Sequence, residues 1–272
     1  MCQFNISEFP DDWFDLDDTV IPNTYTYNKP MIDFVVYLTK LFAKRIPSLG
    51  TIAVFHQDID LALGKETNPR TGELYGFGRD RFPDSLANTY RVLCENGFGV
   101  YDEGVAQVCR DIGMQAFDEA NYKETGFSPG AEDVLNFLTK RKHRLVLVTK
   151  GDEWVQNKKI DALDLRRWFR DIFIVPQKTP EVYREIVSSL RDADRRAHRR
   201  QCDAQKTLVI GNSFHSDIKP GLDIGMSGIF VPCPTWKAER IDKGRLSRNE
   251  RRRLIETPKI IDIISLYQMV AA

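Results

Sequence analysis

The spacing of apolar and polar residues divides the chain into two kinds of sequence. Between about residues 21 and 127 the apolar residues recur at helical spacing, which predicts helices at 31–44, 51–63, 85–94 and 103–117. A stretch rich in Gly and Pro at 68–83 predicts one long loop within this block. From residue 128 onward, helical patterns alternate with short, continuous apolar runs of the kind found in buried strands.

The alternating region predicts a parallel sheet covered by helices on both faces, because β-α-β crossovers produce that arrangement. The expected strands are 145–148, 172–175, 208–210 and 229–231, with 260–264 as a candidate edge element. The expected helices are 128–141, with Ser128 as N-cap and Pro129 in the first turn, then 155–168, 180–190 and 218–224. The apolar pair Trp13-Phe14 predicts one more strand. The predicted fold is therefore an α/β, Rossmann-like parallel sheet built from 1–20 and 128–272, with an inserted all-helical cap at 21–127.

Composition is that of an ordinary globular protein. The 272 residues are 42% apolar and 29% charged, and the formal net charge is zero. This balance gives no electrostatic reason to expect nucleic acid or an anionic membrane as a partner. No apolar run is long enough to cross a bilayer, and the N-terminus has no basic region followed by an apolar run.

Cysteines and basic runs add little to this expectation. The five cysteines are scattered without a Cys-x-x-Cys pair, so neither a disulfide framework nor a zinc site is predicted, and a cytoplasmic location is expected. The segments 191–200 and 240–253 are basic but contain acidic residues, which favours solvated helices over a nucleic-acid surface. The oligomeric state stays open.

Candidate chemistry begins directly after Trp13-Phe14. Asp15 and Asp17 lie two residues apart, so a strand that runs into a loop here places both carboxylates on one side. Such a pair suits Mg²⁺, which prefers oxygen ligands, or covalent chemistry with one nucleophile and one proton carrier. The competing interpretation is a solvated acidic turn that also includes Asp11 and Asp12.

The other predicted strands also end in residues of useful chemistry. In open parallel sheets, ligands bind beyond the carboxyl ends of the strands, so these residues are expected to converge. Thr149 and Lys150 suit the oxygens of an anion, and Lys178 supplies a fixed positive charge. Asn212 and Asp217 supply oxygen ligands for a cation. Mg²⁺ and a lysine are what phosphoryl transfer requires, because its catalysis consists largely of positioning and charge stabilisation.

Simpler interpretations exist for single residues. Lys178 could be a surface lysine before a helix, and Thr149 a helix cap. His215 lies within the Asn212–Asp217 segment, but the chemistry needs no histidine there. Residues 79–81 (Arg, Asp, Arg) either select substrate or belong to a solvated loop.

Taken in order, these segments resemble the four motifs of the haloacid dehalogenase (HAD) superfamily. Asp15-Leu16-Asp17-Asp18-Thr19 resembles the first motif, Thr149 the second, Lys178 the third and 211–217 the fourth. The resemblance implies that Asp15 is the nucleophile and a metal ligand. It implies that Asp17 is the general acid/base and binds metal through its backbone carbonyl.

The second and third motifs of this superfamily hold the phosphoryl group, which implies that role for Thr149 and Lys178. The fourth motif holds Mg²⁺. It usually has an Asp where this chain has Asn212, whose amide oxygen brings no charge, so Asp217 is an alternative direct ligand.

The resemblance implies a Mg²⁺-dependent phosphomonoester hydrolase that acts on a small phosphorylated metabolite through a phospho-aspartyl intermediate on Asp15. A phosphomutase or another phosphoryl transferase would use the same core chemistry. A dehalogenase needs no leaving-group acid, and Asp17 argues against it. A non-catalytic binding protein on this fold is the remaining alternative, with Asn212 as its best support.

Overall fold

The computed structural model describes residues 5–233 and 246–271. The chain divides into two compact units. The first comprises Met1–Pro22, Gly126–Gln156 and Leu163–Ala272, and the second comprises Asn23–Thr125 and Asn157–Ala162.

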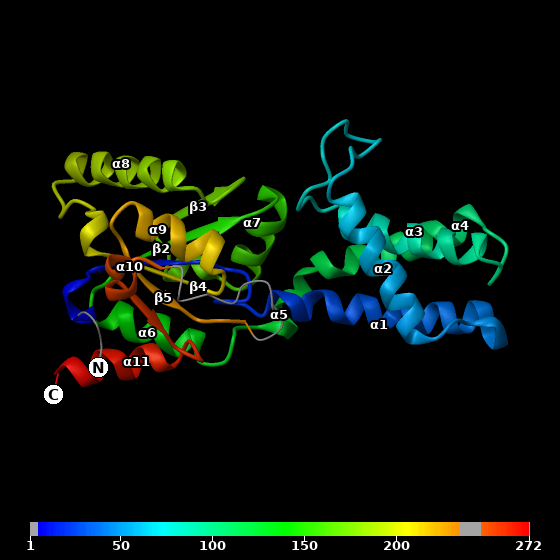
Figure 1. Cartoon of the computed structure of the whole chain (residues 1–272), viewed down its shortest axis with the longest axis horizontal. Coiled ribbons are helices and arrows are strands. Elements are labelled where there is room, and N and C mark those ends of the chain that lie inside the picture. Colours follow the sequence, from blue (N-terminus) through cyan, green and yellow to red (C-terminus); the bar gives the residue numbers. More distant parts are fainter. Residues whose placement is uncertain (1–4, 234–245, 272) are drawn as a thin grey trace. The chain divides into compact units, whose positions relative to one another are not determined.

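A parallel sheet forms the centre of the first unit (Figure 1). Within the described residues its strands are β1 (Asp11–Phe14), β2 (Arg144–Lys150), β3 (Asp171–Val175), β4 (Thr207–Gly211), β5 (Ser227–Phe230) and β6 (Leu254–Glu256). Their order is β3-β2-β1-β4-β5-β6. Strand β1 lies between β2 and β4, with Phe14 in register with Leu147 and Ile210. This confirms the predicted α/β class, and it places the segment after β1 at the middle of the sheet.

Helices cover both faces of this sheet. The helices of this unit include α6 (Ala131–Lys140), α8 (Pro180–Arg196), α9 (Lys219–Asp223), α10 (Arg248–Arg252) and α11 (Asp262–Ala271). Figure 1 shows α8 and α9 over one face, and α6 and α11 over the other. Helix α7 (Glu153–Ala162) belongs to both units, because its residues up to Gln156 count with the first and the rest with the second.

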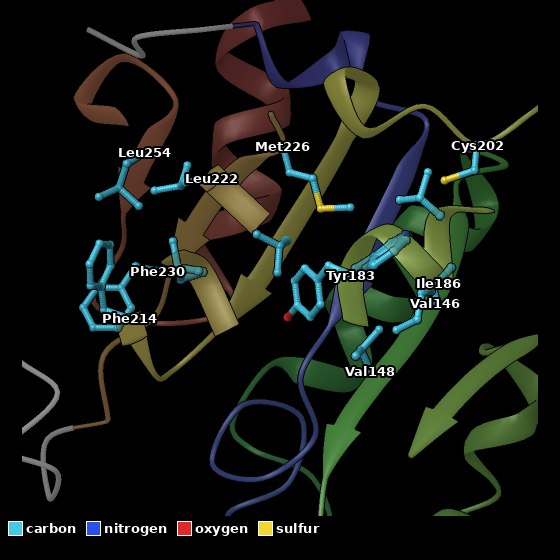
Figure 2. Packing of buried hydrophobic residues seen from close by; sticks show 14 of the residues in the cluster. Val146, Val148, Tyr183, Ile186, Cys202, Phe214, Leu222, Met226, Phe230 and Leu254 are labelled. Atoms are coloured by element: carbon cyan, nitrogen blue, oxygen red, sulfur yellow. The ribbon is translucent and has the colours of Figure 1, made fainter. Parts of the chain in front are cut away.

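Alternating side chains of the strands build the core. Trp13 packs edge-on against Tyr183 of α8 at a ring-centroid distance of 5.5 Å, whereas the next residue, Phe14, contacts Phe169 at 5.9 Å. Figure 2 shows part of the core cluster that contains Trp13, in which Val146 and Val148 of β2 and Phe230 of β5 meet residues of α8 and α9. Burial of each such side chain stabilises the fold by roughly 1.5–3 kcal/mol.

The second unit is helical within the described residues. Its helices are α1 (Asn23–Phe42), α2 (Leu49–Leu63), α3 (Arg81–Glu95), α4 (Glu103–Met114) and α5 (Glu119–Thr125), and α7 contributes its last turns. Helices α3 and α4 approach closely at Gly113, where a Cβ atom would lie 2.6 Å from Cα of Pro83. Within residues 79–81, Asp80 and Arg81 contact charged side chains of the same unit. Asp80 accepts a hydrogen bond from Arg110 at 2.8 Å, and Arg81 donates one to Asp60 at 3.0 Å.

Two sequence-based expectations about elements were wrong. Helix α6 begins at Ala131 after Gly130, which has a φ of 84°, while the carbonyl of Ser128 accepts the N–H of Ala131 in a turn at 2.8 Å. Ser128 is therefore not the N-cap. Residues 260–264 are not an edge strand, because α11 begins at Asp262 and the edge strand is β6. Strand β6 has only three residues, which is too short to produce a recognisable alternation.

The described residues of both basic segments are mostly exposed, as expected of solvated helices, with Asp194 and Leu246 as buried exceptions. In 240–253, residues 240–245 lie outside the described part, and α10 follows with Ser247 and Glu250 forming a capping box. In 191–200, helix α8 ends at Arg196, and Asp194 is fully buried. Among the described residues, no helix is long and apolar enough to cross a membrane.

Candidate active site

The loop after β1 carries the first predicted site residues. The N–H of Asp15 donates to the carbonyl of Ile210 at 2.9 Å, which continues the β1–β4 pairing one residue beyond the strand. The chain then turns tightly, because the N–H groups of Val20 and Ile21 both donate to the carbonyl of Leu16. Asp18 adopts a left-handed φ of 58° in this turn. The turn leaves Asp15 buried and Asp17 half-buried at the carboxyl end of the central strand.

Two side chains bind the carboxylate of Asp15. Its Oδ1 accepts a hydrogen bond from the ammonium of Lys178, and its Oδ2 accepts one from the hydroxyl of Thr19 at 3.0 Å. Both partners are themselves buried, so the position of this carboxylate is fixed.

Lys178 lies between β3 and α8, and its side chain is only 2% exposed, which excludes the surface-lysine interpretation. Its ammonium also donates to Oδ1 of Asp217 at 2.7 Å. The other carboxylate oxygen of Asp217 accepts the N–H of Ser213 at 2.9 Å. Gly211 leaves the room for this, because a Cβ atom there would lie 2.5 Å from Oδ2 of Asp217. Asp217 thus holds Lys178 in place and closes the loop after β4.

Asn212 lies on the other side of Asp15. Its amide oxygen is 3.2 Å from the hydroxyl of Thr19, the same hydroxyl that contacts Oδ2 of Asp15. A hydroxyl has one proton, so it donates to only one of these two acceptors at a time. Two oxygen acceptors that converge with a single proton between them suit a cation.

The described residues contain no group of three or more His, Cys, Asp or Glu side chains arranged to hold a metal ion. The Asp15 carboxylate and the Asn212 amide oxygen, which both approach the hydroxyl of Thr19, are nevertheless oxygen donors of the kind that fit Mg²⁺. Such a mixed set suits Mg²⁺, which keeps several of its own waters and takes few protein ligands.

Electrostatics also favour a cation here. Burial raises the pKa of Asp15 to about 7, and the charges of Asp217 and Asp17 add to the rise while Lys178 opposes it. Burial alone would lower the pKa of Lys178, but attraction to Asp15 and Asp217 outweighs it, so the net shift is upward and Lys178 stays charged. The two buried carboxylates share this ammonium. A divalent cation beside Asp15 would restore the charge balance and favour the ionised carboxylate.

Thr149 lies in β2, so it is not a helix cap, and α7 begins only at Glu153. Its side chain is 1% exposed, and its hydroxyl has no hydrogen-bond partner among the described residues. Buried hydroxyls are normally satisfied, so this one is available for an external acceptor such as an anion. Lys150, the next residue, is half-buried at the end of the same strand.

Sequence analysis missed Gln156 and Gly151. The side-chain nitrogen of Gln156 lies 3.1 Å from Oδ2 of Asp17 and 3.3 Å from the carbonyl oxygen of Lys150. Gly151 has a φ of 146°, and a Cβ atom there would lie 2.8 Å from this nitrogen. The glycine after Thr149-Lys150 was a signal for close backbone approach, but nothing in the sequence connected Gln156 with Asp17.

Other candidate residues lie apart from this cluster. His215 is exposed on the turn of Phe214–Ile218, with its ring against Phe214. Asp11 and Asp12 do not form a solvated turn, because both are fully buried in β1. Asp11 accepts two hydrogen bonds from Arg200 at 2.9 and 2.7 Å, and a carboxylate oxygen of Asp12 lies 2.7 Å from Nδ1 of His143.

Known structures share this architecture. A haloacid dehalogenase-like hydrolase from Xanthomonas campestris is 21% identical, with a TM-score of 0.62 over 96% of each chain. The HAD-hydrolase YfnB from Bacillus subtilis, whose structure was determined with bound magnesium, is 18% identical, with a TM-score of 0.59 over 97% of this chain and 99% of that one. The chain has the HAD-like fold. The resemblance found in the sequence is thereby confirmed at the level of the fold.

The proteins that resemble this chain in structure or in sequence have different activities. L-2-haloacid dehalogenase from Xanthobacter autotrophicus is 13% identical, with a TM-score of 0.56 over 96% of this chain and 98% of that one. Among curated proteins, glyceraldehyde 3-phosphate phosphatase of Pyrococcus abyssi is 24% identical over 123 residues, 43% of this chain. That match covers 48%, about half, of the relative's length. No protein-family profile matches the chain. The fold is therefore that of HAD-like hydrolases, and the fold alone does not decide between these activities.

Proposed function

We propose that this protein is a Mg²⁺-dependent phosphomonoester hydrolase that acts on a small phosphorylated metabolite. The observation that carries the proposal is the arrangement around Asp15. A buried carboxylate is fixed by Lys178 and Thr19, and the partnerless hydroxyl of Thr149 lies on the adjacent strand β2. A fixed nucleophile, a buried cation and a free donor together suit the attack of a carboxylate on an anionic phosphoryl group.

In the first proposed step, a carboxylate oxygen of Asp15 bonds to phosphorus and the bond from phosphorus to the substrate oxygen breaks. Asp17 donates its proton to that oxygen, so the product leaves as a neutral alcohol. Lys178 offsets the negative charge that develops on the phosphoryl group, and the hydroxyl of Thr149 donates to one of its oxygens.

In the second proposed step, Asp17, now ionised, takes a proton from water as that water attacks the phosphorus of the aspartyl phosphate. The bond between phosphorus and Asp15 breaks, inorganic phosphate leaves, and Asp17 is again protonated. When bound, Mg²⁺ supplies positive charge to the phosphate oxygens and to Asp15, with Asp15, Asn212 and the carbonyl of Asp17 as its protein donors.

The sequence also named Asp217 as a metal ligand. The partners of its two oxygens, Lys178 and the N–H of Ser213, favour an indirect role. We therefore propose that Asp217 acts mainly by holding Lys178, and that Asn212 binds the metal.

The helical block at 21–127 is proposed to be a cap on a core formed by 1–20 and 128–272. A cap would enclose a small substrate and exclude water while the phosphoryl group is transferred. The phosphatase activity of the Pyrococcus abyssi relative supports a small phosphorylated substrate.

Dehalogenation is the second candidate reaction, because dehalogenases share the fold. A halide leaves without a proton, so dehalogenation does not need a general acid. In this structure, however, Gln156 donates a hydrogen bond to the half-buried carboxyl group of Asp17. The hydrogen-bonded Asp17 favours phosphoryl transfer.

The test is a screen of phosphorylated metabolites, glyceraldehyde 3-phosphate among them, for release of inorganic phosphate with Mg²⁺ present. Asp15→Asn is the matched control, because the amide is nearly isosteric but a poor nucleophile. We expect the variant to retain less than about 1% of the activity, within the loss known for removal of a catalytic nucleophile, and to melt as a folded protein. Release of chloride from 2-chloroacids without release of phosphate would overturn the proposal. Transfer of the phosphoryl group to a sugar in place of water would identify a mutase.

A further inference from the structure

The environment of Gln156 is more specific than the packing of a helix requires. This residue lies in the first turns of α7, and its side chain is 3% exposed. Its amide nitrogen contacts two oxygen acceptors, Oδ2 of Asp17 at 3.1 Å and the carbonyl of Lys150 at 3.3 Å. Both amide hydrogens are thereby used. The orientation of the amide is also fixed, because a flipped amide would place the side-chain oxygen against the two acceptor oxygens.

The backbone is built around this contact. Gly151 has a φ of 146°, which favours glycine, and a Cβ atom there would lie 2.8 Å from the Gln156 nitrogen. The side-chain oxygen of Gln156 is buried and has no partner among the described residues. The polar contacts that fix this side chain are therefore those of its nitrogen, one of which is to Asp17.

A hydrogen bond of this kind determines where a carboxyl group carries its proton. Oδ2 of Asp17 accepts the amide hydrogen of Gln156, so this oxygen is the less favourable place for an acid proton. The same hydrogen bond fixes the orientation of the whole carboxyl group. A general acid works only if its proton points at the leaving oxygen within hydrogen-bond reach.

We infer that Gln156 is a positioning residue for the proposed general acid/base, because its hydrogen bond fixes the orientation in which the carboxyl group of Asp17 delivers and recovers the proton. Gln156 acts through Asp17 and does not touch the phosphoryl group. The inference rests on the proposed function, since a general acid is needed only where the leaving group must be protonated.

The test compares substrates with poor and good leaving groups. Gln156→Leu keeps the size of the side chain and removes the donor. We expect kcat/KM for an alkyl phosphate to fall about 10–100-fold, because a general acid contributes roughly 10²–10⁴-fold and loses part of this when it is misplaced. For an aryl phosphate such as p-nitrophenyl phosphate, kcat/KM should fall less than about 3-fold. Gln107→Leu is the matched control, because Gln107 also donates to a carboxylate, that of Asp111 at 2.8 Å, but lies in α4 of the helical unit.

A double-mutant cycle separates positioning from a merely structural effect. In the Asp17→Asn background, Gln156→Leu should cause less than about a 3-fold further loss, because the group that it positions is already gone. Gln156→Glu gives a second variant if Leu impairs folding, and we expect the same selective loss for alkyl phosphates.

Equal losses for alkyl and aryl phosphates, or additive losses in the double mutant, would overturn the role of Gln156 while leaving phosphatase activity established. If the wild-type protein releases no more phosphate than Asp15→Asn, the proposed function fails, and this inference fails with it.

Discussion

Charged residues are buried at both ends of the central sheet, but they are organised differently. At the amino ends of the strands each fully buried carboxylate has a partner that no other fully buried carboxylate shares, although Arg144 also contacts the half-buried Asp171 at 3.2 Å. Asp11 is paired with Arg200, Asp12 with His143, and Asp194 with Arg144 at 2.6 Å. At the carboxyl ends, Asp15 and Asp217 share the ammonium of Lys178.

We infer from this difference that the charges at the amino ends serve the fold, whereas those at the carboxyl ends form the proposed active site. A buried charge with a dedicated partner contributes to a well-defined fold, and removal of the partner destabilises the protein. A cluster with more negative charge than positive, beside a hydroxyl that has no partner, is costly for the folded protein unless a ligand completes it. The residues at the carboxyl ends of the strands are therefore the ones suited to bind a cation and an anion.

The largest effect is expected from Lys178→Ala. Loss of the ammonium removes the charge that steadies Asp15 and, under the proposed mechanism, the phosphoryl group, and added Mg²⁺ would not replace it. Phosphate release should fall by at least about 10²-fold at saturating Mg²⁺, comparable to the loss of one oxyanion donor. Steady-state kinetics over a Mg²⁺ series measures this, and an unchanged rate would show that Lys178 has no catalytic role.

A smaller effect, on the metal, is expected from Asn212→Asp. An added carboxylate increases the charge of the donor set, so the Mg²⁺ concentration for half-maximal activity should fall about 10-fold, since affinity rises with ligand charge.

Asp217→Asn should lower the maximal rate more than it shifts the Mg²⁺ concentration for half-maximal activity, because we propose that Asp217 acts through Lys178. A large rightward shift at unchanged maximal rate would instead make Asp217 a direct ligand.

The pKa of Asp15 gives a prediction for stability. Its pKa is raised from 3.8 to about 7, so the cost of the ionised group is absent below 3.8, grows as the pH rises, and is complete above about 7. In EDTA, the Tm of Asp15→Asn relative to wild type should therefore increase between pH 5 and pH 8, by about 2–4 °C for each kcal/mol of that cost. Mg²⁺ at pH 8 should stabilise wild type more than the variant. A Tm difference that is constant with pH would contradict the charge imbalance.

The smallest effect is expected at the other end of the sheet. Arg200→Ala breaks the pair with buried Asp11, but the arginine side chain is 49% exposed, so solvent screens the loss. We expect a destabilisation of about 1–3 kcal/mol in urea unfolding, because Asp11 stays buried without its partner, and a kcat within about 2-fold of wild type. A large loss of activity in the folded variant would mean that the two ends are coupled.

The sequence was informative where the spacing of apolar residues predicted a strand and a chemically useful residue followed it. The continuous apolar run of β2 predicted a buried central strand, and Asp15, Lys178, Asn212 and Asp217 do lie within one connected cluster. It was misleading for Asp11 and Asp12, whose burial depends on partners at positions 200 and 143, far away in the chain. Gln156 was missed for the same reason, since its partner Asp17 lies 139 residues away. Pairs of this kind form only when the chain folds, and spacing along the sequence cannot reveal them.

The most direct test of the central claim is to trap the intermediate. Wild-type protein is quenched in acid during turnover of a good substrate with Mg²⁺, digested, and analysed by mass spectrometry. The account predicts that the peptide containing Asp15 gains the mass of one phosphoryl group, that hydroxylamine removes it, and that Asp15→Asn does not acquire it. Turnover with the phosphoryl group on another residue, such as His215, would contradict the assignment of Asp15 as the nucleophile.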